Sequence, residues 1–125
     1  MYYDVPRGKW LSESSCQIAF GYSGNNYGPA YFPWHNGVSF GAAYGFTAAA
    51  DGTVVGMVYT RTDSDEVWFV VRTNGVNIGA ITSTVNNAVH SDLDWDFEAG
   101  NIIAIANENL PVSTPAGYFK IRFRE

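Results

Sequence analysis

Three carboxylates at alternate positions, Asp92, Asp94 and Asp96, are the residues of this sequence whose spacing most suggests chemistry. On an extended strand, successive side chains of this kind lie about 6.5–7 Å apart on one face. A calcium ion needs about six to eight oxygen ligands at about 2.3–2.6 Å, so these residues would share one only if the strand bent or a loop such as 63–65 supplied oxygens. If calcium is bound at all, we expect these three residues to hold it.

A solvated strand face explains the same three residues without a metal. Charges on an exposed strand discourage edge-to-edge aggregation, and cross-strand ion pairs each contribute about 0.2–1 kcal/mol. The arginines available for such pairs are Arg61, Arg72, Arg122 and Arg124. The sequence therefore predicts no metal site and no cofactor.

The sequence shows no recognisable catalytic constellation. Glycosidase carboxylates flank a sugar in a cleft about 5–9.5 Å apart, whereas a regular exposed strand offers no cleft and no reason for one acid to stay protonated. There is neither a nucleophile elbow nor a phosphate-cradling glycine loop. The single cysteine, Cys16, cannot form an internal disulfide or a Cys-rich zinc site, and a small hydrophobe on a strand accounts for it. We predict a protein that binds rather than catalyses.

The aromatic stretch 27–36 is the better candidate for function. It is dense in glycine, proline and aromatic residues, which is typical of a loop. Exposed aromatic rings stack on sugar faces and anchor protein contacts, and neighbouring Asn and His side chains supply hydrogen bonds. The predicted ligand-binding residues are Tyr31, Trp34, His35 and Asn36. The alternative is that Tyr31 belongs to the core and the stretch only covers one end of the fold.

Strands must position these residues, and the middle of the chain indicates them most clearly. Residues 53–62 and 67–73 are rich in β-branched and aromatic side chains, and residues 76–81 continue the pattern. Asn74-Gly75 separates the last two runs, and this dipeptide favours a type I′ hairpin turn because both positions need positive φ. The sequence therefore predicts an antiparallel hairpin around Asn74 and Gly75.

The last third of the chain alternates between apolar and polar residues. In the run 89–97, Val89, Leu93, Trp95 and Phe97 fall on one face of a single predicted strand. After a turn at 98–101, residues 102–106 predict a strand buried on both faces. Residues 117–124 predict a final strand with its aromatic face inward. Trp68 and Trp95 are expected in the core or between the sheets, and Trp10 over the open end of the fold.

Seven or eight short strands with turn residues between them predict an all-β domain, either a sandwich or a jelly roll. A chain of 125 residues, 46% of them hydrophobic, fits a single domain over residues 1–125. The formal net charge of −5 disfavours nucleic acid and anionic membrane surfaces as partners. No apolar run is long enough to insert into a membrane, and residues 1–4 lack the features of a signal peptide.

The order of the motifs resembles the tumour-necrosis-factor-like trimeric jelly rolls of bacteriophage tail-fibre and tail-needle tips and of collagen-like bacterial surface proteins. The pieces that carry the resemblance are Val54–Tyr59, Glu66–Gly75, Leu93–Phe97, Ala99–Ile105 and Tyr118–Phe123, with residues 8–12 and 18–21 as the opening. The Ala-Gly-x-Ile turn at residues 99–102 is the most specific of these, although sandwiches of other families share it. The likeness covers residues 8–125.

This resemblance implies a jelly roll of about eight antiparallel strands that assembles as a homotrimer. Tyr118, Phe119 and Phe123 would then contact the symmetry axis. Phe119 and Phe123 fit an ordinary core better, whereas Tyr118, expected on the outer face, is the better interface residue. It further implies a receptor-binding tip on a virion surface, with a cell-surface glycan or protein as partner and residues 1–12 leading in from a longer fibre chain. A monomeric carbohydrate-binding module of a secreted protein, or a purely structural trimerisation or capsid-decoration domain, remains open.

Overall fold

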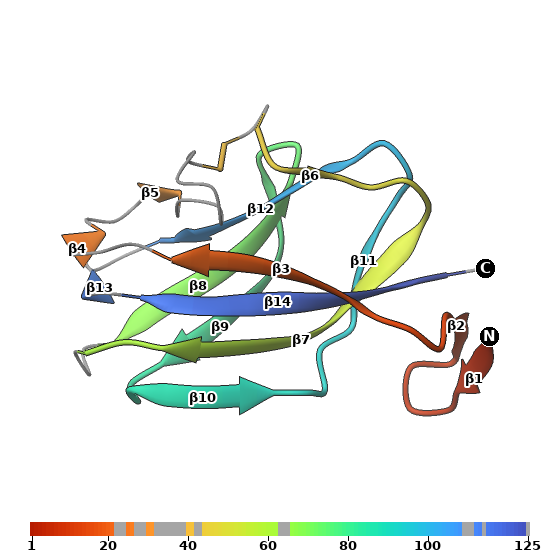
Figure 1. Cartoon of the computed structure of the whole chain (residues 1–125), viewed down its shortest axis with the longest axis horizontal. Coiled ribbons are helices and arrows are strands. Elements are labelled where there is room, and N and C mark those ends of the chain that lie inside the picture. Colours follow the sequence, from red (N-terminus) through yellow and green to blue (C-terminus); the bar gives the residue numbers. More distant parts are fainter. Residues whose placement is uncertain are drawn as a thin grey trace.

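The computed structural model describes residues 1–21, 25–26, 30–31, 40–41, 44–62, 66–108, 112–113 and 115–124. Two antiparallel sheets face each other and form a β-sandwich (Figure 1). The first sheet has the order β10-β7-β14-β3, and β11 also pairs with β7. Its strands are β3 (Cys16–Gly21), β7 (Gly52–Thr60), β10 (Asn87–His90), β11 (Trp95–Phe97) and β14 (Ala116–Phe123).

The second sheet has the order β5-β12-β8-β9, and β6 also pairs with β12. Its strands are β5 (Ala30–Tyr31), β6 (Phe46–Thr47), β8 (Val67–Thr73), β9 (Val76–Ser83) and β12 (Ile102–Asn107). Two small sheets complete the described fold, one of β1 (Tyr2–Asp4) with β2 (Lys9–Leu11), the other of β4 (Asn25–Asn26) with β13 (Val112–Ser113). The prediction of an antiparallel all-β fold is confirmed.

The hairpin predicted at Asn74-Gly75 is present. Thr73 pairs with Val76, and the two turn residues have φ of 50° and 85°, as a type I′ turn requires. Asn74 also links the turn to β12, because its side-chain oxygen accepts a hydrogen bond from the Ile102 amide at 2.9 Å. The turn therefore fixes both the register of its own hairpin and its position beside β12.

The core lies between the sheets. Phe119 and Ile121 of β14 and residues 103–106 of β12 are at most 1% exposed, so the predictions of an inward aromatic face on the last strand and a doubly buried strand before it are confirmed. The Tyr59 and Phe69 rings meet across the sandwich with centroids 4.6 Å apart. Burial of such large apolar side chains is the main force that holds the two sheets together.

The prediction of one continuous strand over residues 89–97 is wrong. Residues 91–94 are not in a strand, and the faces of β10 and β11 are out of phase. Val89 is 73% exposed, whereas His90 stacks on the buried Tyr59 with ring centroids 6.2 Å apart. The cause is in β7, where the register with β14 shifts between Lys120 and Ile121. A β-bulge adds one residue and so exchanges inward and outward side chains beyond it.

One of the three tryptophans discussed above lies where the sequence predicts, and two do not. Trp95 packs against the core, as expected. Trp68 is instead 42% exposed, and its indole nitrogen donates to Glu66 at 3.2 Å. Trp10 is 52% exposed on β2 and meets the Tyr3 ring edge-on, so it does not cover the end of the sandwich. Strand periodicity assigned Trp68 incorrectly because an aromatic residue is equally compatible with either face of a strand.

Candidate functional site

The predicted ligand loop lies almost wholly outside the described residues. Trp34, His35 and Asn36 belong to that part of the chain. The backbone of Tyr31 is described, and it pairs with Ala106 in the β5–β12 ladder. Tyr31 therefore ends a short strand of the second sheet, and the role of the stretch 27–36 as a ligand site stays a prediction.

Two of the three predicted calcium residues are engaged by a lysine. The Lys9 ammonium lies 2.7 Å from an Asp94 carboxylate oxygen and 2.8 Å from one of Asp96. Arg124 also lies 3.8 Å from Asp96, so this one of the suggested arginine pairs is present. Asp92 is exposed and is not part of this group. Among the described residues, no group of three or more potential metal-ligating side chains is placed to hold an ion.

The contact between Lys9 and Asp96 shifts the pKa of each of these two side chains. Burial favours the neutral acid of Asp96, but hydrogen bonds from Lys9 and Thr53 outweigh it and hold the pKa of this carboxyl below its usual value. Burial likewise disfavours the Lys9 cation, yet its bonds to Asp94 and Asp96 raise the lysine pKa. The acidic residues therefore act as an attachment for the β1–β2 hairpin.

The predicted interface residues separate into two groups. Phe119 is fully buried, and Phe123 packs against the core, so both contact the interior of their own sandwich. Tyr118 is partly exposed and alternates with them, on the outer face of the first sheet. Of these three residues, Tyr118 alone has its side chain on the outer face, and its role in a subunit contact stays a prediction.

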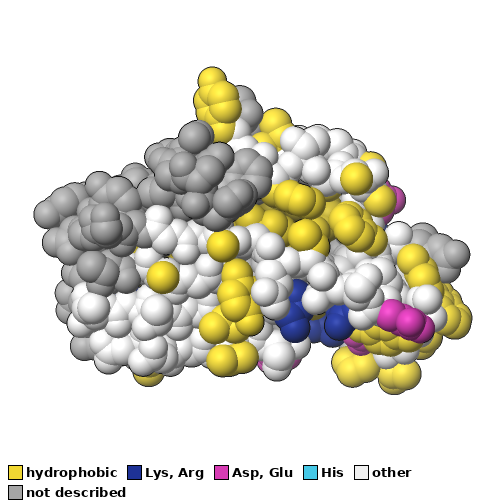
Figure 2. All heavy atoms as spheres, in the orientation of Figure 1, with side chains coloured by type: hydrophobic (Ala, Val, Ile, Leu, Met, Phe, Trp, Pro, Cys, Tyr) yellow, Lys and Arg dark blue, Asp and Glu magenta, His cyan; other side chains and the backbone are white. Residues whose placement is uncertain are grey.

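Tyr118 belongs to an apolar row that crosses the outer face of the first sheet. It pairs directly with Ala19 of β3 and Val58 of β7, and Val58 pairs with Val89 of β10. We call these four residues the apolar stripe. Figure 2, which views this sheet from outside, shows a hydrophobic band across it and a cluster of Lys and Arg side chains beside the band. An apolar row across exposed strands is typical of a contact surface rather than of a solvated face.

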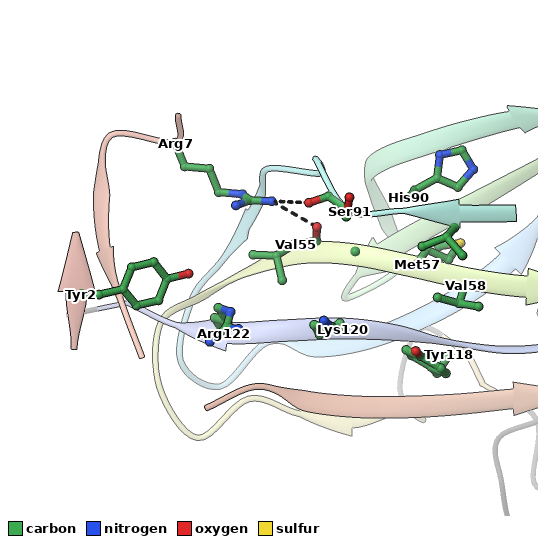
Figure 3. Close-up of a pocket in the computed structure, with 12 residues that line it drawn as sticks. Tyr2, Arg7, Val55, Met57, Val58, His90, Ser91, Tyr118, Lys120 and Arg122 are labelled. Carbon is green, nitrogen blue, oxygen red and sulfur yellow. Dashed lines mark hydrogen bonds between the residues drawn. The ribbon is translucent and has the colours of Figure 1, made fainter. Parts of the chain in front are cut away.

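A pocket of about 240 Å³ opens beside the apolar stripe. Its walls come from the β1–β2 hairpin, from β7 and β14, and from the end of β10 (Figure 3). Gly56 of β7 lies in its lining, directly opposite Lys120 in the ladder with β14. A Cβ at Gly56 would lie 2.9 Å from the His90 carbonyl oxygen, so glycine keeps the floor free of a side chain.

Arg7 forms one wall of the pocket and joins the hairpin to the sandwich. Its Nε donates to the Leu93 carbonyl at 2.7 Å, and its Nη2 donates to those of Val55 and Ser91 at 3.2 and 3.0 Å (Figure 3). These carbonyls lie at the bulge of β7 and at the break between β10 and β11. The guanidinium therefore supplies donors to carbonyls where the ladder is interrupted. Of these three, the Val55 carbonyl also accepts from the Leu93 amide at 3.2 Å.

The charge of Arg7 is balanced inside the hairpin. Asp4, only 6% exposed, accepts from Arg7 Nη1 at 2.7 Å. Burial favours the neutral form of Asp4, but the hydrogen bonds and charge of Arg7 outweigh it and lower the pKa of Asp4. Arg7 therefore adds donors to the pocket wall without adding net charge.

Two other cations of the pocket have no carboxylate partner among the described residues. The Lys120 side chain forms no hydrogen bond or ion pair there. Arg122 donates to the carbonyl of Ser12 at 2.8 Å and to that of Glu13, and its guanidinium lies 5.5 Å from the centre of the Tyr2 ring. The described lining contains no Asp or Glu. In an acidic chain, this is a local concentration of positive charge.

Sequence reasoning identified Tyr118 but missed the pocket. The outward positions of Lys120 and Arg122 followed from the alternation of the last strand. The β1–β2 hairpin lies more than 80 residues away from Leu93 and Asp94 in sequence, and no local pattern indicated that it docks there. Gly56, which interrupts the run of β-branched residues in β7, was the one available signal for a close approach or a bulge.

No family model, curated protein or solved structure matches this chain. The described residues also contain no helix with the length and hydrophobicity needed to traverse a lipid bilayer. The strand order, the apolar stripe and the pocket are therefore the features of the molecule that bear on its function.

Proposed function

We propose that this chain is a non-enzymatic binding domain of jelly-roll topology that assembles as a homotrimer and forms the receptor-binding tip of a bacteriophage fibre. Its partner in this proposal is a glycan or protein on the surface of the host cell, and its location is the virion surface. The order of strands in the two sheets is the observation that carries the proposal.

In the two large sheets, eight strand positions follow one another along the described chain, if β5 with β6 and β10 with β11 each count as one. The first position, β3, pairs with the last, β14. Moving inward, β5 and β6 pair with β12, β10 and β11 pair with β7, and β8 pairs with β9. A long antiparallel hairpin rolled into two sheets would have this nested pairing, so the pairing supports the jelly-roll part of the proposal.

The apolar stripe supports self-association. Val89 is 73% exposed in the single chain, and Tyr118 combines an apolar ring with a polar hydroxyl, as interface residues often do. The stripe crosses β10, β7, β14 and β3 of the first sheet, so a flat surface of another subunit can cover it. In the proposed trimer, symmetry places an identical stripe on every subunit.

The mass in solution tests this assembly. One chain has a mass of 13.7 kDa, and light scattering behind a sizing column at neutral pH should give three times this value. A screen of the same sample on a glycan array should then give saturable binding. A single-chain mass would contradict the trimer. A trimer without any glycan or cell-surface ligand would instead support the purely structural role, trimerisation or capsid decoration.

A monomeric carbohydrate-binding module is the second candidate, and one observation favours it. Tyr3 and Trp10 are 47% and 52% exposed and lie edge-to-face with ring centroids 5.4 Å apart. Exposed aromatic rings stack on sugars. This candidate predicts a monomer whose glycan binding is lost in Trp10→Ala, whereas Trp68→Ala, an exposed tryptophan on the second sheet, serves as the control.

A further inference from the structure

The pocket beside the apolar stripe combines unpaired positive charge with a floor that has no side chain. Lys120 and Arg122 project from alternate positions of β14, about 6.5–7 Å apart along one face. Gly56 leaves room between them and the end of β10. An alanine at residue 56 would require the His90 carbonyl to move.

The charge of this pocket is not explained by the fold. Lys9, Arg72 and Arg7 all contact carboxylates within 4 Å, and those contacts fix the hairpin and the second sheet. The Lys120 side chain has no hydrogen bond or ion pair with the described residues, and Arg122 has only carbonyl and aromatic partners. Two neighbouring like charges repel each other, so their placement without a carboxylate costs free energy. An anion between them would remove that cost.

The donors of the pocket suit an oxyanion. A carboxylate or sulfate accepts charge-assisted hydrogen bonds from lysine and arginine. Such bonds are stronger than hydrogen bonds between neutral groups. The Ser91 residue at the end of β10 adds a further polar wall. The opposite wall is apolar, with Val58, Val89 and Tyr118, and can contact the ring of a sugar.

The volume of the pocket limits the size of the ligand that it can hold. About 240 Å³ is below the approximate range of 300–1,000 Å³ for sites that enclose drug-sized ligands. The pocket therefore admits one charged unit of a larger ligand rather than the whole ligand. A chain that carries such units and continues over the surface would satisfy this limit.

We propose that this pocket binds the carboxylate or sulfate group of an acidic saccharide. The oxyanion part of this assignment follows from the pocket itself, whereas the saccharide part rests on the proposed recognition of a cell-surface glycan. Because Val58, Val89 and Tyr118 belong both to the pocket and to the apolar stripe, a bound unit would border the surface proposed for trimer contact.

The test is a titration of the full ¹⁵N-labelled chain, in its solution assembly, followed by NMR. D-glucuronate, D-glucose and sodium sulfate are added separately at constant ionic strength, because salt screens exposed charges. The amide signals of Gly56, Ser91 and Lys120 report on the pocket. Lys120→Gln removes the unpaired charge, and Arg72→Gln removes the same charge from the second sheet as a matched control. Signal dispersion in each spectrum establishes that the variant is folded.

Glucuronate should shift the pocket signals saturably and glucose should not. Lys120→Gln should weaken glucuronate binding about tenfold, since a charge-assisted hydrogen bond is lost, and Arg72→Gln should leave it unchanged. The absence of a saturable shift, or equal weakening in both variants, would overturn the assignment. Equal affinity for sulfate and glucuronate would overturn its saccharide part.

The failure of this inference is distinguishable from that of the proposed function. A trimer that binds glycans on the array but not glucuronate in this pocket would overturn the pocket assignment and leave the fibre-tip proposal standing. A monomer that binds glucuronate with the predicted dependence on Lys120 would overturn the fibre-tip proposal and leave the pocket assignment standing.

Discussion

The indole of Trp95 lies against the backbone of Gly79, so closely that a Cβ on Gly79 would be 2.0 Å from Trp95 Cδ2. Trp95 belongs to β11 of the first sheet and Gly79 to β9 of the second. The contact therefore closes the sandwich at the edge where β9 and β11 meet. No side chain other than hydrogen fits between these two strands.

Gly79→Ala should destabilise the fold. The added methyl group has to displace the Trp95 ring, and such overpacking costs about 1–3 kcal/mol. Urea unfolding followed by tryptophan fluorescence measures the loss as a lower midpoint with an unchanged slope. Thr82→Ala, an exposed position on the same strand, is the control and should change the stability by less. Equal midpoints for Gly79→Ala and the unchanged chain would show that the ring does not occupy this position.

Arg7→Met should loosen the break between β10 and β11. It retains much of the aliphatic stem but removes the guanidinium donors from the carbonyls of Val55, Ser91 and Leu93. The Val55 carbonyl keeps its bond from the Leu93 amide, whereas an acceptor left unsatisfied costs about 1–3 kcal/mol where water does not replace the bond. Hydrogen exchange should therefore accelerate at the amide of Leu93, which donates to the Val55 carbonyl at 3.2 Å.

The control for Arg7→Met is Asp4→Asn, which weakens the ion pair but retains all three guanidinium–carbonyl bonds. It should leave exchange at Leu93 nearly unchanged. If both variants accelerate exchange equally, Arg7 acts through Asp4 and the hairpin rather than directly on the carbonyls.

The Lys9–Asp96 pair should make stability depend on pH at both ends of the scale. The pKa of Asp96 is lowered in the folded chain from 3.8, so its contribution is present above that value and is lost as the pH falls through the folded pKa. The pKa of Lys9 is raised from 10.5, so its contribution is present below that value and is lost as the pH rises through the folded pKa.

Urea midpoints across this range check the dependence. Because the Asp96 side chain is 47% exposed, the pair should contribute only about 0.2–1 kcal/mol. Lys9→Met should lower stability at neutral pH by this amount and remove the loss at high pH. If the loss of stability at high pH persists unchanged in Lys9→Met, groups other than Lys9 cause it.

The sequence predicted those parts of the fold whose signals are local. The Asn74-Gly75 turn needs positive φ at adjacent residues, and few dipeptides tolerate that. The inward positions of Phe119 and Ile121 followed from strict alternation beside charged residues. Each of these inferences used residues within a few positions of one another, and each is confirmed.

The remaining features depend on contacts between distant segments. The phase change between Val89 and Trp95 arises from a bulge in β7, a different strand, so alternation within residues 89–97 alone could not reveal it. The pairing of Lys9 with Asp94 and Asp96 likewise requires the hairpin to dock on β11. The acidic residues therefore suggested a metal, although a lysine from the other end of the chain already balances two of them.

Val89→Asp should dissociate the proposed trimer without unfolding the subunit. Val89 is 73% exposed in the single chain, so a carboxylate there is hydrated in the monomer. Within a subunit contact this carboxylate would lose its hydration, which costs several kcal/mol. Val76→Asp, a 66% exposed valine on β9 of the second sheet, is the matched control and should remain trimeric. Light scattering should give the single-chain mass for Val89→Asp alone, whereas a trimer that survives Val89→Asp and dissociates in Val76→Asp would move the contact surface to the second sheet.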